Sequence, residues 1–254
     1  MREANRLVGA TLAELFSHIR PGVSTLELDK VADEFIRDHG AVPTFKGFPN
    51  PNGPAFPASI CTSVNHCVVH GVPSADVILK EGDIVSIDCG TKLNGFCGDS
   101  AYTFCVGEVS EEVRKLLRVT KESLYKAIDI ALVGKHVGDI SSTVQDYCES
   151  NGYGVVRELT GHGIGKEMHE DPAVPNYGKR GNGPVLKHGM CIAIEPMITM
   201  GNRAIGLMPD KWSIVTRDGL PAAHFEHTIA IRRGSQPEIL SSFEEIERLE
   251  GKLY

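Results

Sequence analysis

The chain has 254 residues and a formal net charge of −7, and its 41% hydrophobic and 23% charged residues are typical of a globular protein. The acidic balance, without a cluster of lysines and arginines, argues against direct binding of nucleic acid. No run approaches the roughly 18 apolar residues of a membrane span, the N-terminus lacks a signal-peptide pattern, and seven cysteines without a Cys-x-x-Cys pair favour reduced thiols in the cytoplasm.

Two amphipathic helices are predicted at the start of the chain, over residues 2–19 and from Ser24 to Gly40. Apolar residues recur at steps of three and four in both helices, and Ser24 with Glu27 forms a capping-box pattern. A short strand is predicted over 41–45. Residues 46–58 contain four prolines and two glycines, so a surface loop is expected before a strand over 60–64.

A β-hairpin is predicted over residues 84–104. Two β-prone runs flank a stretch that contains three glycines and an asparagine. Asp88 closes the first strand and Asp99 opens the second, so their carboxylates are expected to lie together. A solvated turn would explain an isolated pair of this kind, whereas two neighbouring buried carboxylates repel each other and call for a cation.

The second half of the chain repeats the strand pattern. Residues 79–88 align without gaps on residues 186–195, 107 positions further on, and each stretch ends on an acid. The strand that follows in each half begins with an acid. The repeated acids are Asp88 and Asp99 in the first half, and Glu195 and Glu226 in the second.

The helices repeat as well, at an offset of 112 positions. A third helix is predicted from Ser110 to Gly134 and a fourth up to Gly152, and a short closing helix is expected around Phe243, Ile246 and Leu249. These patterns predict one α+β domain over residues 1–254, made of halves of about 1–109 and 110–254, with strands in the middle and helices outside. Because each half supplies two acids, the halves are expected to share one sheet.

A metal site is the chemistry that these residues favour. Four converging carboxylates carry four negative charges, which two divalent cations would balance. His162, which lies among Gly161, Gly163 and Gly165, would fit between them. Oxygen-rich ligation with one imidazole suits Mn, Fe(II), Co or Zn, and two such ions about 3.5–4 Å apart can activate a water molecule for hydrolysis.

Other interpretations of the same residues remain open at this point. The glycines at 161–165 resemble a phosphate loop, but they lack its strand-to-helix context. His162 alone could be a hydrogen-bonded structural residue. His70 and His169 each lie beside a turn, where a histidine is often merely solvated.

In this order and spacing, the segments resemble methionine aminopeptidase of type I over nearly the whole chain. The resemblance implies the pita-bread fold, a pseudo-two-fold symmetric antiparallel sheet with helices on the outside. The segments that carry it are Asn65–Ser74, Ile87–Gly90, Gly98–Ala101, Gly161–Gly165, His169–Pro172, Ile194–Pro196 and Phe225–Thr228.

The resemblance also implies the roles of individual residues. Asp99 and Glu226 would bridge two divalent ions (Co, Mn, Fe or Zn). Asp88 would complete the coordination of one ion, and His162 with Glu195 would complete the coordination of the other. Glu195 would act as the catalytic base. His169 would donate a hydrogen bond to the scissile carbonyl, and His70 would contact the backbone after the methionine. An apolar methionine pocket would include Phe56, Cys61, Met168 and Trp212, for which core packing is the alternative.

The function implied is removal of the N-terminal methionine from nascent proteins and peptides, with preference for a small second residue. The partners are then N-terminal peptides, with the ribosome as a further candidate, and a monomer is expected. A longer loop over 47–56, His66 and Met168 depart from the pattern of many relatives and leave the pocket rim and fine substrate preference open.

Rival functions within the same fold are an X-Pro aminopeptidase and a non-enzymatic peptide-binding protein. The first normally carries an extra N-terminal domain, for which this chain has no room. The second arises by loss of metal ligands, whereas all five ligand positions are present here. The 26 positions from His169 to Glu195 are too few for the inserted segment of the type II enzyme.

Overall fold

The computed structural model describes residues 1–251, and its first half begins with α1 (Arg2–Phe16) and α2 (Thr25–Asp38). The capping box of Ser24 and Glu27 is present at the start of α2. Helix α1 ends three residues earlier than expected, because the next backbone N–H groups bond in tighter turns. The strands of this half are β1 (Val42–Pro43), β2 (Ile60–Val64), β3 (Cys67–Val69), β4 (Ile84–Leu93) and β5 (Phe96–Cys105).

The second half again begins with a helix pair, α3 (Glu111–Ile130) and α4 (Val137–Ser150). Helix α4 begins and ends 112 positions after α2, which agrees with the predicted repeat. The remaining elements are β6 (Gly154–Val155), β7 (Thr160–Gly163), β8 (Glu170–Pro175), β9 (Cys191–Ile194), β10 (Met197–Thr199), β11 (Ile205–Leu207), β12 (Ile214–Thr216), β13 (Ala222–His224), β14 (Glu226–Ala230), β15 (Glu238–Ile239) and α5 (Glu244–Glu250).

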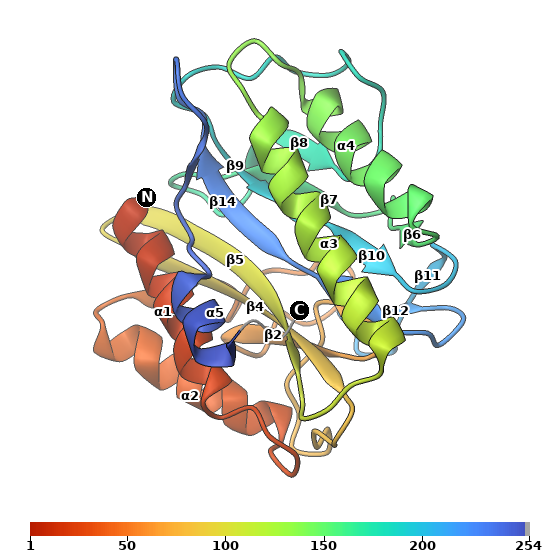
Figure 1. The fold of residues 1–254 in the computed structure, drawn as a ribbon. Helices are drawn as coiled ribbons and strands as arrows, with labels where there is room; N and C mark the ends of the chain where they lie inside the picture. Colours follow the sequence, from red (N-terminus) through yellow and green to blue (C-terminus); the bar gives the residue numbers. More distant parts are fainter. Residues whose placement is uncertain (252–254) are drawn as a thin grey trace.

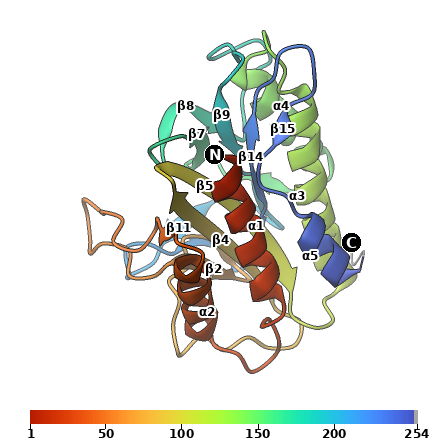
Figure 2. The same ribbon diagram turned by 90° about the vertical axis from the view of Figure 1, so that its left-hand side faces the viewer.

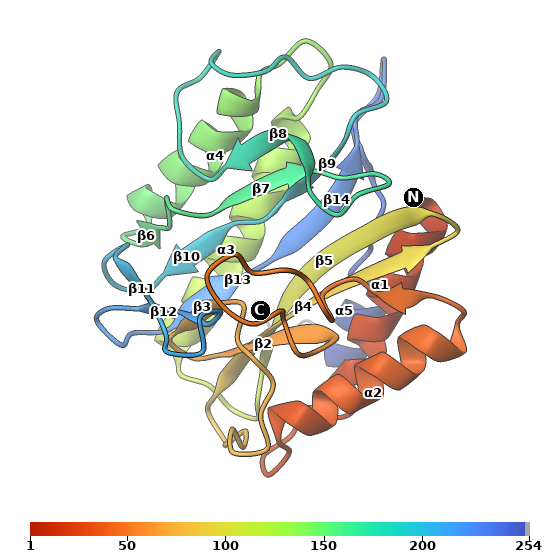
Figure 3. The ribbon, with the colours of Figure 1, turned by 180° about the vertical axis from the view of Figure 1, so that it is seen from behind.

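One large sheet joins the two halves. Its strands follow the order β1-β4-β5-β14-β9-β7-β8, with β2 added to β4 and β15 to β14, and these pairs are antiparallel. Figures 1 and 2 show α1, α3 and α5 against one face of this sheet. Figure 3 shows the opposite face, which the segment between β1 and β2 crosses. The predicted α+β fold with an antiparallel sheet and outer helices is confirmed.

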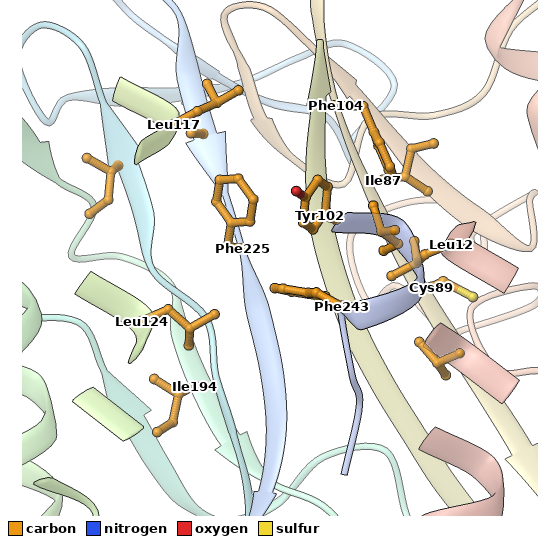
Figure 4. Close-up of a cluster of buried hydrophobic side chains, with 14 of the residues drawn as sticks. Leu12, Ile87, Cys89, Tyr102, Phe104, Leu117, Leu124, Ile194, Phe225 and Phe243 are labelled. Carbon is orange, nitrogen blue, oxygen red and sulfur yellow. The ribbon is translucent and has the colours of Figure 1, made fainter. Parts of the chain in front are cut away.

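The main hydrophobic core fills the space between the sheet and the helices. Figure 4 shows Tyr102 of β5 close to Phe225 and Phe243 at the line where the halves meet. The Tyr102 ring centroid lies 5.0 Å from that of Phe225 and 4.8 Å from that of Phe243, both in edge-to-face geometry. Apolar contacts thus hold β5 and β14 together from the helix side.

The hairpin differs from its prediction in where the turn lies. Strands β4 and β5 have ten residues each, and only Asn94 and Gly95, both with positive φ, form the turn. Asp88 and Asp99 therefore lie inside the strands and not at their inner ends. Gly98 lies in β5, opposite Thr91. A glycine is needed there because α1 crosses the strand so closely that a Cβ would lie 2.6 Å from the carbonyl carbon of Ala4.

Smaller differences follow from packing. The strand expected over 41–45 is only Val42–Pro43, and the third helix ends at Ile130. The loop over 46–58 is irregular as predicted, but Phe56 at its end is buried. In the closing helix Phe243 and Ile246 are buried, whereas Leu249 is 50% exposed. Among the described residues, no helix combines the length and apolar character needed to cross a bilayer.

The close crossing of α1 over β5 gives a test of the fold. We expect Gly98→Ala to lower the free energy of unfolding by about 1–3 kcal/mol, since the backbone of α1 must move to admit a methyl group. Gly206→Ala is the matched control in β11, where the nearest atom to the new Cβ is 3.9 Å away. Equal denaturant midpoints for the two variants would contradict this packing.

Candidate active site

The strand register brings carboxylates from three strands onto one face of the sheet. Ala101 of β5 lies opposite Asp88 on β4 and opposite Glu226 on β14, so these three residues form one row. Asp99 lies two residues before Ala101 and therefore points to the same face. The small side chain of Ala101 leaves space between the acids.

The five predicted metal-ligand positions line one cavity of about 320 Å³. One ligand atom each from Asp99, His162 and Glu226 lie within 4.8 Å of one another. His162 Nε2 is 3.5 Å from Asp99 Oδ2 and 3.8 Å from Glu195 Oε1. Asp88 and Glu195 are not part of this group of three, but they line the same cavity.

His162 is oriented by its own strand. Its Nδ1 lies 2.9 Å from the carbonyl oxygen of Gly163, so Nδ1–H donates and Nε2 faces the carboxylates. Gly161 and Gly163 lie in β7, where the backbones of the neighbouring strands leave no room for a Cβ. Gly161 and Gly163 are thus close-packed strand residues, and the next element after β7 is the strand β8 and not the helix that a phosphate loop requires.

The acids are buried with few compensating charges. Asp99 and Glu226 are 3% and 2% exposed. Burial and the neighbouring carboxylates raise the pKa of Asp88 and of Glu226 well above the usual range, and burial also raises the pKa of Asp99. Burial lowers the pKa of His162, but Asp99 and Glu195 outweigh this effect and raise it to about 9.

The donor chemistry fits divalent cations. One oxygen of each of Asp88, Asp99 and Glu226 is buried and has no hydrogen-bond partner among the described residues. Buried charges of one sign are stable in proteins when they are paired or bind a metal. Carboxylate oxygens with one imidazole nitrogen are ligands for first-row divalent metals.

Two further predicted histidines line the same cavity. Burial lowers the pKa of His70 to about 4, and burial followed by repulsion from His162 lowers the pKa of His169. The ring centroid of His169 lies 4.4 Å from that of His162 and 5.3 Å from that of Phe48. Both histidines are therefore neutral at pH 7, and each has one N–H to donate.

The apolar wall of the cavity includes three of the predicted pocket residues. Phe56, Cys61 and Trp212 line it. Phe56 and Trp212 meet edge to face at 5.1 Å, and the Trp212 indole N–H donates to the carbonyl oxygen of Pro54. The loop before β2 and the segment before β12 thus hold each other in place.

Met168 is placed elsewhere. It packs with the buried Cys97 and Ile164 and lies directly over Gly90, where a Cβ would overlap its terminal methyl group. It lines a surface groove together with Lys92, Glu167 and His169. The chain folds this way because Gly90 opens a space that the flexible thioether fills.

The structure adds site residues that the sequence analysis missed. The side chain of His224 is buried, and its Nε2 lies 3.6 Å from Glu195 Oε2. Its position two residues before Glu226 was an available signal, because residues two apart in an extended chain point to the same side. The cavity-lining residues missed are Phe45, Phe48, Glu158, Leu159, Thr160 and Met197.

Comparison with known proteins agrees with this geometry. A sequence model of metallopeptidase family M24 matches residues 1–233. The chain belongs to metallopeptidase family M24. Within this family, it is 53% identical over 241 residues to the methionine aminopeptidase of Clostridium acetobutylicum. The aligned region covers 95% of this chain and 94% of that protein.

Solved M24 structures show the same fold. The methionine aminopeptidase from Thermotoga maritima superposes with a TM-score of 0.91 at 42% identity, over 95% of both chains. The prolidase from Pyrococcus furiosus gives a TM-score of 0.76 at 23% identity, and the chain covers 63% of it. At that identity the prolidase shows the fold alone.

Repulsion in the carboxylate cluster gives a second test. The raised pKa of Glu226 means that the metal-free folded protein loses stability as pH rises through and above the ordinary carboxyl range. We expect metal-free Glu226→Gln to unfold at a higher temperature than the parent at pH 8, by at least about 2 °C. The difference should shrink toward pH 4.

The control for this test is Glu34→Gln, which removes an exposed charge on α2. Scanning calorimetry with chelator at both pH values gives the comparison. A Glu226→Gln protein that is less stable than the parent at pH 8 would contradict the proposed repulsion.

Proposed function

We propose that this protein removes the N-terminal methionine from nascent proteins and peptides by metal-dependent hydrolysis, preferring a small second residue. The observation that carries the proposal is the single cavity in which five potential metal ligands face an apolar, aromatic wall. The 53% identity to a methionine aminopeptidase over 95% of the chain supports the same reaction. We extend the proposal to residues 1–254 as one catalytic domain that acts as a monomer in the cytoplasm, with the ribosome as a candidate partner.

In this proposal, two divalent ions (Co, Mn, Fe or Zn) are held by Asp88, Asp99, His162, Glu195 and Glu226. Asp99 and Glu226 would contribute to both ions, as the resemblance to methionine aminopeptidases implies, and their ligand atoms lie within 4.8 Å of each other and of His162. Asp88 would complete one ion, and His162 with Glu195 the other. When bound, such ions polarise a carbonyl and lower the pKa of water.

Glu195 is the residue that we assign to proton transfer. Its carboxylate follows the end of β9, between His162 on one side and His224 on the other. It would accept a proton from the attacking water and deliver it to the leaving amine. The two histidines and the bond from Asn176 Nδ2 to the Glu195 carbonyl oxygen limit its movement.

The neutral histidines would bind the peptide backbone. His169, next to the ligand cluster, would donate its N–H to the scissile carbonyl and to the negative charge that develops there. His70 would contact the backbone of the second residue. A neutral imidazole suits this role because it donates without carrying a charge that repels the metal ions.

The apolar wall would receive the methionine side chain. Phe56, Cys61 and Trp212 line the cavity together with Phe45 and Phe48. Aromatic edges and small thiols pack well against a thioether. Met168 does not line the cavity, and we leave it out of the proposed pocket.

An X-Pro aminopeptidase is the second candidate. The resemblance to prolidases is low in sequence and covers only part of their length. We expect the metal-loaded protein to release methionine from Met-Ala-Ser and to leave X-Pro peptides uncut, and a chelator should abolish the activity. Cleavage of X-Pro peptides with Met-Ala-Ser untouched would contradict the proposed function.

The role of Glu195 has its own test. Glu195→Gln keeps the size and one oxygen of the side chain, so it should fold normally but lower kcat by about 10²–10⁴-fold. Glu34→Gln serves as the control with wild-type kcat. Near-normal turnover in Glu195→Gln would remove the residue from proton transfer.

A further inference from the structure

The backbone ladder between β5 and β14 ends beside the two central acids, Asp99 and Glu226. Glu226 lies opposite Ala101 and His227 opposite Ser100. In the part of the chain that the structure describes, the ladder between these strands does not continue to the next position, where Asp99 would face Thr228. The backbone of Asp99 is therefore not held by β14 in the usual way.

Side chains take over the missing ladder bonds. The Thr228 hydroxyl Oγ1 donates to the carbonyl oxygen of Asp99 at 2.8 Å, and the Asp99 N–H donates to Asn5 Oδ1 of α1 at 3.2 Å. The backbone of Thr228 turns instead to the segment after β15: its N–H donates to Ser241 Oγ at 3.1 Å, and its carbonyl oxygen accepts from the Leu240 N–H at 2.9 Å. Among the bonds of the described residues, Thr228 thus holds Asp99 through its hydroxyl group.

A reciprocal bond holds the other central acid. Ser100, next to Asp99, donates its hydroxyl to the carbonyl oxygen of Glu226 at 2.6 Å. Ser100 and Thr228 are fully buried, so water cannot replace either bond. Each of the two acids is therefore tied to the opposite strand by a hydroxyl group.

We propose that Thr228 and Ser100 are positioning residues for the metal site. Their two hydroxyl bonds fix the separation of Asp99 and Glu226 at the place where like charges push the strands apart and the backbone ladder has ended. This inference rests on the proposed function, because it requires Asp99 and Glu226 to be ligands. Partners that orient metal ligands typically contribute about 10- to 100-fold to metal affinity.

Three variants separate positioning from ordinary stability. Thr228→Val keeps the shape of the side chain and removes the hydroxyl, and Thr228→Ser keeps the hydroxyl. Thr120→Val is the matched control, because Thr120 is equally buried and donates to Leu116 O at the same 2.8 Å, but in α3. Each metal-free protein is titrated with Mn²⁺ by calorimetry, and its unfolding temperature is measured with chelator.

We expect Thr228→Val to bind Mn²⁺ about 10- to 100-fold more weakly than the parent. Thr228→Ser should stay within about threefold, since the hydroxyl bond remains. Thr120→Val should lower the unfolding temperature like Thr228→Val but keep parental Mn²⁺ affinity. Should Thr228→Val fail to fold, Ser100→Ala, which removes the reciprocal bond, is titrated in its place with the same expectation.

Two results would overturn the inference: parental Mn²⁺ affinity in the hydroxyl-deleted variant, or an equal loss of affinity in Thr120→Val. If the parent binds Mn²⁺ and cleaves Met-Ala-Ser while the variant binds normally, only the positioning role is wrong. If the parent neither binds Mn²⁺ nor cleaves the peptide, the proposed function is wrong as well.

Discussion

Repulsion among buried carboxylates is the constraint on which this structure depends. Asp88, Asp99 and Glu226 point to one face of the sheet, and each has a buried oxygen without a partner among the described residues. Such an arrangement costs free energy in the metal-free protein, because each charge is removed from water and placed beside another of the same sign. The fold around it must therefore be held together by other interactions.

Those interactions lie behind the site. The aromatic cluster of Tyr102, Phe225 and Phe243 packs on the helix side of β5 and β14, so apolar burial opposes the electrostatic repulsion across the sheet. The ten-residue pairing of β4 with β5 fixes Asp88 relative to Asp99. The junction of β5 with β14 is shorter, and there the site depends on side-chain hydroxyl groups as well as on the ladder.

The division of the chain into two related halves explains why the site lies at their junction. Each half supplies two acids from neighbouring strands of the sheet, and only the shared sheet brings the two sets within reach of each other. The aromatic wall comes from a different source, the irregular segment before β2 together with Trp212 near β12. In the proposed function, metal ligation and substrate recognition are thus assigned to separate parts of the fold, one on the strands of the sheet and one formed from loops.

The sequence by itself determined the helices and the repeat and predicted the candidate metal ligands, because apolar periodicity and a run of acids at matching offsets are local properties of the chain. It could not determine where the hairpin turns, because glycines usually indicate a turn, whereas Gly90 and Gly98 lie inside the strands. There, close contacts with Met168 and α1 leave no room for a side chain. For the same reason Met168 was expected in the pocket and lies outside it, and His224 was missed although it meets Glu195. Contacts between residues far apart in the chain depend on strand register and close packing, and only the tertiary structure decides those.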